Sequence, residues 1–292
     1  MKKSLRSRSR RARAGFSLAE LLVAVVLLGI VGGALTRLVV DQMRFFDNVQ
    51  VGRSTRSAAR NSMNVMLSEL RMVQDSGGVT AIAADNKSIT VNVPYRFGAF
   101  CGTAGGLSTV SMLPVDSATL ALASYAGYGY RARLSGRYVT VASATAPAAS
   151  ASATTCTTTA GINTITINGR TGQVLDITPA IPATTTQGSA VMFYQSVTYS
   201  FQNSTLFPGK IGLFRSVNGG TAEELMAPFA TSARFRYFQD GDDTSRTTAP
   251  ALSDIRGVAM VLTTEGARKP AGRTSYAQTR MMTAIFFKNT RQ

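Results

Sequence analysis

The stretch that decides the fold is "RARAGFSLAELLVAVVLLGIVGG", residues 11–33. A cluster of arginines stops at Gly15, directly before Phe16, and a single carboxylate, Glu20, stands at the edge of an otherwise apolar run. The run extends from Leu18 to Val40 with few polar side chains. As a helix it is about 35 Å long, which is enough to cross a hydrocarbon core of about 30 Å. It therefore predicts a transmembrane helix.

The positive charge of the chain is concentrated at its start. The 292 residues carry a formal net charge of +16, and residues 1–15 hold seven basic side chains and no acidic one. Without them, 24 basic and 15 acidic residues remain, a net charge of +9. A basic segment before an apolar run is retained on the cytoplasmic side of a membrane. We therefore expect residues 1–15 to be a leader and exclude them from reasoning about the fold.

Two ordinary explanations of the apolar run leave part of it unexplained. In a secretory signal peptide the small-residue cleavage site follows the apolar core, whereas Gly15 precedes it. A plain membrane anchor accounts for the length of the run but not for Glu20, because a carboxylate near hydrocarbon costs free energy. The glycine and the glutamate therefore need a common explanation.

The segment "AGFSLAELLVAVVLLGI", residues 14–30, resembles the processing and methylation segment of type IV prepilins and pseudopilins. The resemblance implies that a membrane-embedded prepilin peptidase cuts between Gly15 and Phe16 on the cytoplasmic side. It implies next that the new amino terminus, Phe16, is N-methylated. Glu20 then becomes the fifth residue of the mature chain. The expected partners are this peptidase, the inner membrane and other pilin subunits.

The resemblance and the cost of a buried charge together suggest a role for Glu20. Cleavage creates a second charge in apolar surroundings, the amine of Phe16. In a filament of packed helices, Glu20 can neutralise the amine of a neighbouring subunit or its own. We therefore expect an assembly salt bridge at Glu20, with an unpartnered glutamate at the membrane interface as the alternative.

One long helix is expected to continue past the membrane. No proline interrupts residues 17–75, and "DSGG" follows as a stop signal. We expect a helix over residues 16–76, transmembrane over 18–40 and a stalk over 41–76. In the stalk, apolar residues spaced four and three apart predict one face that packs on a sheet, and arginines predict a solvated face. The apolar residues are Ala59, Met63, Met66, Leu70 and Val73, and the arginines are Arg53, Arg56, Arg60 and Arg71.

Residues 77–292 predict a β-rich head, because alternating and β-branched segments are separated by turn signals. A helix followed by many strands indicates the α+β class, with an antiparallel sheet laid on the helix. The two most apolar of the last strands, 255–264 and 280–289, are expected in the centre of the sheet. The other expected strands are 88–95, 138–143, 162–168, 190–202, 210–217 and 232–240.

The two cysteines, Cys101 and Cys156, fall in the part expected outside the membrane, where oxidation is permitted. We expect a disulfide between them, with two unrelated free thiols as the alternative. Cys156 lies in residues 141–160, of which 17 are Ala, Ser or Thr. That composition is typical of an exposed, variable loop, which the disulfide would tether.

Few residues suggest chemistry. The chain has no histidine, which removes histidine-based catalytic triads and most zinc sites. We expect no enzyme, no catalytic residue, no cofactor and no metal. "DGDD", residues 240–243, offers oxygen ligands for Ca²⁺ but lacks the rest of an EF-hand, so a polar turn is favoured. "YAGYGYRARLSGRY", residues 125–138, mixes tyrosine and arginine as single-strand binders do, although a basic strand or loop explains it as well.

The order of segments in the second half of the head also resembles two kinds of subunit. These are the PilW-like minor pilins and the J-type pseudopilin of type II secretion. The resemblance implies a minor structural subunit that is incorporated into a pilus or primes or caps it, with a J-type pseudopilin as the alternative. A DNA-binding subunit for uptake is the alternative of another class, although nucleic acid is a less favoured partner. The expected location is the inner membrane with the head outside, and then the filament.

Overall fold

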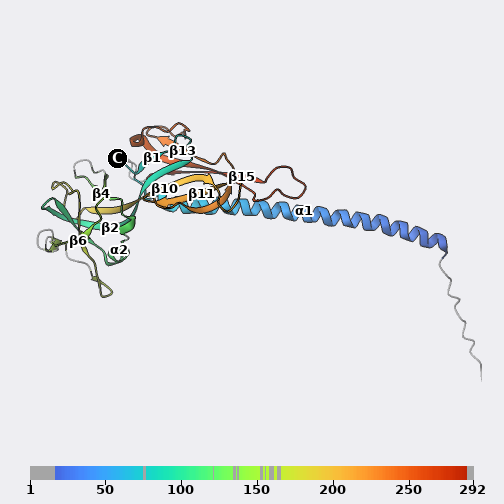
Figure 1. The fold of residues 1–292 in the computed structure, drawn as a ribbon, viewed down its shortest axis with the longest axis horizontal. Coiled ribbons are helices and arrows are strands. Elements are labelled where there is room, and N and C mark those ends of the chain that lie inside the picture. Colours follow the sequence, from blue (N-terminus) through green and yellow to red (C-terminus); the bar gives the residue numbers. More distant parts are fainter. Residues whose placement is uncertain are drawn as a thin grey trace, which may run out of the picture.

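The computed structural model confirms the α+β class, with a long helix projecting from an antiparallel sheet (Figure 1). It describes residues 17–287 except 75–76, 121, 134–135, 137, 152–153, 155, 158–160 and 163–165. One end of the helix is free of the head, and the other end lies against the sheet (Figure 1).

The helix α1 (Leu18–Leu70) has 53 residues and is about 80 Å long if straight. It was expected to reach residue 76, but it ends earlier because the chain tightens after Leu70. The amides of Met72 and Val73 bond to carbonyls three residues back, those of Glu69 and Leu70. Such bonds satisfy the last carbonyls of a helix and stop its propagation.

The buried face of α1 follows the predicted apolar stripe and extends it toward the membrane. Ala59, Met66 and Leu70 are fully buried, as is Val73 just beyond the helix, whereas Met63 is half-buried. The four arginines of the stalk are exposed, as predicted. Spacings of four and three keep this face turned toward the sheet over five turns. The buried residues of α1 are Val51, Thr55, Ala59, Ser62, Met66 and Leu70.

Thirteen strands form the main sheet, and every ladder in it is antiparallel. The main path runs β13-β14-β12-β11-β10-β2-β3-β9-β6, with β1, β4, β5 and β15 attached at its sides. The strands of the first half are β1 (Val79–Ile82), β2 (Ser88–Ala104), β3 (Leu107–Met112), β4 (Gly127–Arg131), β5 (Tyr138–Ala142), β6 (Ala148–Ala149) and β9 (Val174–Ile177). Those of the second half are β10 (Ala190–Asn203), β11 (Ile211–Val217), β12 (Glu223–Phe229), β13 (Arg234–Gln239), β14 (Ile255–Glu265) and β15 (Gln278–Phe286).

The remaining elements are short. They are the hairpin β7 (Thr166–Ile167) and β8 (Arg170–Thr171), the helix α2 (Pro114–Ala118), and two 3₁₀ turns at Leu122–Ser124 and Leu252–Asp254. The strand expected over 162–168 is thus reduced to β7 within the described residues, since 163–165 lie outside them.

The place of the last strand differs from the prediction. β14 is central as expected, with β13 and β12 on one side and β15 on the other. β15 pairs with β14 alone among the described strands and is therefore an edge strand. The apolar run had suggested a central strand. Only one face of β15 packs toward α1, and the other face stays exposed, including Met282 and Phe286.

The head contains two hydrophobic cores joined by two long strands. The proximal core packs α1 against β2 and β10 to β15, and it includes Met66, Tyr199 and Met260. The distal core packs the far ends of β2 and β10 with β3, β4 and β9, and it includes Phe100 and Phe193. The lobe around the distal core lies at the end of the head opposite the free part of α1 (Figure 1). The strands β2 and β10 run through both lobes.

A partly buried ion pair fastens the end of α1 to the sheet. The Glu69 carboxylate accepts bonds from Arg215 Nη2 at 2.9 Å, Arg215 Nε at 3.2 Å and the Tyr199 hydroxyl at 2.5 Å. Tyr199 is fully buried, and about a fifth of each charged side chain is exposed. Burial raises the pKa of Tyr199, and the carboxylate of Glu69 raises it further. The hydroxyl therefore stays protonated and donates to Glu69.

Glu69→Gln is expected to lower the free energy of unfolding by about 2–3 kcal/mol, because it leaves Arg215 without an ionised partner in a partly desolvated place. That loss corresponds to a melting temperature about 5 °C lower or more for a chain of this size. The measurement is thermal unfolding of the full chain in detergent by circular dichroism. Asp243→Asn, at an exposed carboxylate, is the control and is expected to change it by less than about 0.5 kcal/mol. Equal melting temperatures for the two variants would contradict the role of Glu69.

Candidate assembly site at the free end of the helix

The two processing positions, Gly15 and Phe16, lie outside the described residues, which begin at Ser17. Cleavage between them and methylation of Phe16 therefore remain predictions. The site that the structure describes begins one residue later, with the first turn of α1.

Ser17 and Glu20 form a capping box at the start of α1. The amide of Glu20 donates to Ser17 Oγ at 3.2 Å, and the amide of Ser17 donates to Glu20 Oε2 at 3.0 Å. Each side chain thus satisfies a backbone donor that the first turn of a helix leaves free. The carboxylate also lies at the positive end of the helix dipole, where a negative charge is stabilising. This role of Ser17 was not predicted, although Ser-x-x-Glu is the sequence signature of a capping box.

Glu20 has no cationic partner among the described residues of the chain. Its side chain is exposed, and Oε2 is used by the cap. A carboxylate accepts several hydrogen bonds, so the cap leaves Glu20 able to bind a second donor. The expected donor, the amine of Phe16, falls outside the described residues.

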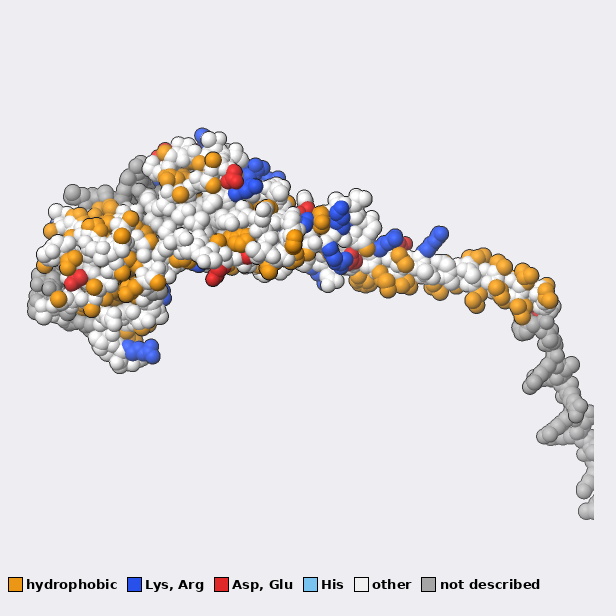
Figure 2. All heavy atoms as spheres, in the orientation of Figure 1, with side chains coloured by type: hydrophobic (Ala, Val, Ile, Leu, Met, Phe, Trp, Pro, Cys, Tyr) orange, Lys and Arg blue, Asp and Glu red, His pale blue; other side chains and the backbone are white. Residues whose placement is uncertain are grey.

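The side chains of residues 17–46, the free segment of α1, are exposed throughout (Figure 2). Leu28 is 77% exposed and Ile30 is 65% exposed. Apart from adjacent residues and the nearby backbone of the helix itself, no described heavy atom lies within 4 Å of a Cβ placed on Gly29, Gly32 or Gly33. By length and composition α1 is able to cross a membrane, and no other described helix is. An apolar surface of this size is stable only in lipid or against other apolar helices.

Hydrogen bonds tie the head to α1 just past the free segment, at Asp47. Arg268 pairs with the Asp47 carboxylate, and the amide of Ala271 donates to Asp47 Oδ2 at 3.0 Å. The amide of Ala271 and then the guanidinium of Arg268 hold the pKa of Asp47 below its usual value. The β14–β15 loop is thereby tied to the helix, and the apolar surface between Leu18 and Val40 is left clear of the head. No local pattern in the sequence indicated this pair, which joins residues 221 positions apart.

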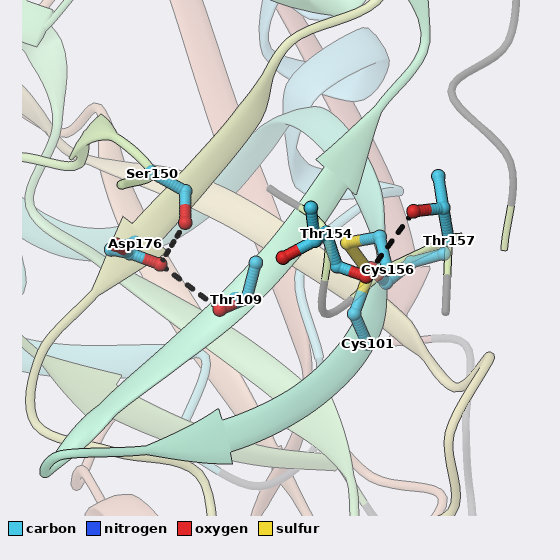
Figure 3. Close-up of a disulfide and its surroundings, with 8 residues drawn as sticks. Cys101, Thr109, Ser150, Thr154, Cys156, Thr157 and Asp176 are labelled. Carbon is cyan, nitrogen blue, oxygen red and sulfur yellow. Dashed lines mark hydrogen bonds between the residues drawn. A yellow bond between two sulfur atoms is a disulfide. The ribbon is translucent and has the colours of Figure 1, made fainter. Parts of the chain in front are cut away.

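The structure joins Cys101 and Cys156 in a disulfide (Figure 3). Cys101 lies in β2, and both sulfurs are buried beside Val174 and Ile162. Near the disulfide, Asp176 Oδ1 accepts bonds from Thr109 Oγ1 at 3.0 Å and Ser150 Oγ at 2.7 Å (Figure 3). The disulfide and these bonds attach described parts of residues 141–160 to the distal lobe.

The two segments singled out for chemistry serve the fold. In "DGDD", Asp242 Oδ1 accepts a bond from the amide of Thr244 at 2.8 Å, and Asp242 Oδ2 accepts one from Arg246 Nε at 2.8 Å. Its oxygens are used within a turn, and these bonds lower its pKa to about 2. No group of three or more possible metal ligands occurs among the described residues.

In residues 125–138, three of the four tyrosines are buried in the distal core. Burial is the main cause that raises the pKa of Tyr128 to about 12. Base stacking requires exposed ring faces, so Tyr125, Tyr128 and Tyr130 offer no platform for bases. These three tyrosines therefore lend no support to a DNA-binding subunit, although the net charge of +9 that also suggested it is unchanged.

Comparison with known families gives a match at the amino-terminal end of the chain. The model of the prokaryotic N-terminal methylation motif matches residues 10–36, which include the capping box and most of the apolar run. The chain matches no curated protein and no solved structure. The matched motif is that of precursors processed by prepilin peptidase, and it supports a structural subunit that is anchored in the membrane and assembles with other subunits. Residues 10–36 thus carry the amino-terminal motif of type IV prepilins and pseudopilins, which supports a place for the chain in that superfamily.

Proposed function

We propose that the protein is a minor subunit of a type IV pilus. It is inserted with residues 1–15 in the cytoplasm and the head, residues 77–292, outside the inner membrane. Prepilin peptidase cuts between Gly15 and Phe16 and methylates Phe16, and the helix of residues 16–76 then enters the filament. The observation that carries the proposal is the methylation motif on a helix whose apolar surface has no partner within the described chain.

The charge distribution supports this orientation. Seven basic residues precede the apolar run, and such segments stay in the cytoplasm. The head therefore follows the helix to the opposite side, where disulfides persist. The buried disulfide between Cys101 and Cys156 is consistent with that compartment.

The shape of the head supports a place at the tip of the filament. The distal lobe lies beyond the part of the sheet that α1 covers, at the end of the head opposite the free part of α1 (Figure 1). A subunit inside a filament has the next subunit above its head, and an extra lobe competes for that space. A subunit at the tip has no such neighbour, and it is also needed in few copies.

Mass spectrometry of the chain isolated from cells tests the class. The expected amino terminus is N-methylated Phe16, with residues 1–15 absent. A chain that begins at Met1, or beyond the apolar run, would contradict the proposal. Sheared filaments then separate the two kinds of subunit. A minor pilin is expected in purified pili at a small fraction of the main subunit, whereas a J-type pseudopilin is expected to be absent from pili and required for type II secretion.

A further inference from the structure

The last strand of the head leaves one edge open. β15 contacts mainly β14 and α1, and within the described residues no strand pairs with its other edge. The nine residues pair with β14 without a register shift or bulge. They contain no proline. Proteins usually shorten, bend or cover such an edge, because its free backbone groups recruit other strands.

The register shows which backbone groups face the open edge. The amide of Phe287 donates to the Arg256 carbonyl at 2.9 Å, and the amide of Gly266 donates to the Ala277 carbonyl at 2.8 Å. Backbone groups alternate between the two sides of a strand, so the odd-numbered residues of β15 bond to β14. The even-numbered residues direct their amides and carbonyls outward, and these residues are Gln278, Arg280, Met282, Ala284 and Phe286.

The side chains of the same residues lie on the face of the sheet opposite α1. The odd-numbered residue Ile285 packs in the proximal core. Because side chains alternate between the two faces of a strand, the even-numbered residues share the opposite face. Met282 is 50% exposed and Phe286 is 53% exposed. The open edge is therefore bordered by apolar surface, which adds burial to any main-chain pairing.

The opposite end of this part of the sheet shows how an edge is closed. The outer side of β13 is bridged by Arg246, whose amide donates to the Tyr237 carbonyl at 2.8 Å and whose carbonyl accepts from the Tyr237 amide at 3.0 Å. No described segment does the same for β15.

Two arginines determine the charge that a partner would need. Arg280 lies in β15, and Arg234 lies two strands away in the row that contains Val261 and Met282. Both are exposed, and neither makes an ion pair within the described residues. A strand added at the edge would be complementary if it placed a carboxylate beside Arg280 and apolar side chains beside Met282 and Phe286.

We propose that the open edge of β15 accepts an extended segment of a different pilin-like subunit, which carries apolar side chains and a carboxylate. The proposal rests on the proposed function, since assembly through α1 brings a neighbouring subunit next to β15, which packs beside that helix. The added strand would fix the position of the neighbour relative to the head, independently of the apolar helix.

A second copy does not fit this edge when the two strands are antiparallel. The symmetry axis between two antiparallel β15 strands is perpendicular to the sheet. Because α1 lies against the sheet, such an axis reverses the direction of one helix relative to the other. Two helices in one membrane, or in one polar filament, point the same way. This geometry rules out antiparallel pairing of two β15 strands. A subunit present in few copies has other subunits as its neighbours, so the proposed occupant is a different chain.

Photo-crosslinking in cells tests the proposal on the full chain. The probe is p-benzoylphenylalanine placed at Ala284, which is exposed beside the open edge, or at Met281, on the face toward α1. The Ala284 probe is expected to link to one other protein, which has its own prepilin motif, through a peptide that contains Asp or Glu. The Met281 probe is expected to link within the chain.

Two substitutions test whether the edge itself is used. Ala284→Pro removes one outward amide and leaves the bonds to β14, so it is expected to reduce the yield from a probe at Phe286 about tenfold. Ala284→Ser keeps the amide and is the matched control. If Ala284→Pro fails to accumulate, Met282→Lys changes only the exposed side chain and is expected to reduce the yield as well.

The outcomes separate this proposal from the proposed function. A chain that begins with N-methyl-Phe16 and is found in filaments, but links to its own copy or to nothing from Ala284, would overturn the edge proposal alone. Equal yields from the proline, serine and lysine variants would also overturn it. A chain without the N-methylated terminus would refute the proposed function, whatever the probe links to.

Discussion

Glu20→Gln is expected to reduce incorporation of the protein into filaments by about tenfold or more, while Ser17→Ala reduces it by no more than about fivefold. The two variants separate the capping role of the first turn of α1, which the structure shows, from the proposed charge pairing of Glu20. Incorporation is measured as the ratio of the protein in sheared filaments to that in membranes, by quantitative mass spectrometry.

The difference rests on what each variant removes. Glutamine at position 20 is able to complete a capping box, so Glu20→Gln keeps the cap and loses the charge. A hydrogen bond that involves a charge contributes about 1.5–3 kcal/mol, which corresponds to tenfold or more in an equilibrium. Ser17→Ala removes one acceptor at the cap, a loss of about 1 kcal/mol in helix stability, and leaves the carboxylate in place.

Both variants keep Gly15 and Phe16, so cleavage and methylation serve as the internal control. Each variant must begin with N-methyl-Phe16 before its incorporation is compared. If Glu20→Gln entered filaments as well as the unmodified chain, charge pairing at Glu20 would not guide assembly. If Ser17→Ala failed as severely as Glu20→Gln, the cap rather than the charge would be the essential feature.

The features that the sequence predicted well are those set by local pattern. The spacing of Ala59, Met66 and Leu70 predicted the buried face of α1, because that face depends only on helical periodicity. The bounds of β10 (Ala190–Asn203) and β14 (Ile255–Glu265) agree with the predicted strands to within one residue. Both strands are long and rich in β-branched and aromatic residues.

The features that escaped prediction depend on contacts between distant segments. The edge position of β15 follows from which strands lie beside β14, and an apolar run carries no information about its neighbours. The same is true of Arg215, which meets Glu69 only because β11 passes the end of α1. The burial of three of the tyrosines in residues 125–138 was not predicted, because composition does not reveal burial. Short strands such as β9 (Val174–Ile177) offer too few residues for a periodic signal.

Removal of the disulfide is expected to lower the stability of the distal lobe by about 4 kcal/mol on the chain-entropy model. The variant is Cys101→Ser combined with Cys156→Ser, whose separation of 55 residues sets the size of the closed loop. Both cysteines border the distal core, and neither touches α1. The loss should therefore appear as an earlier melting of the distal lobe, by about 10 °C or more.

The proximal core provides the internal comparison, because Glu69, Arg215 and the buried face of α1 hold it independently of the cysteines. Limited proteolysis of the full chain in detergent, at rising temperature, reports the two lobes separately through the positions of the cuts. Cuts within residues 141–160 should appear first in the double variant, while fragments that contain α1 and β14 persist. Dithiothreitol should produce the same pattern in the unmodified chain and no further change in the double variant. Equal melting of both lobes would mean that β2 and β10, which run through both cores, join them into one cooperative unit.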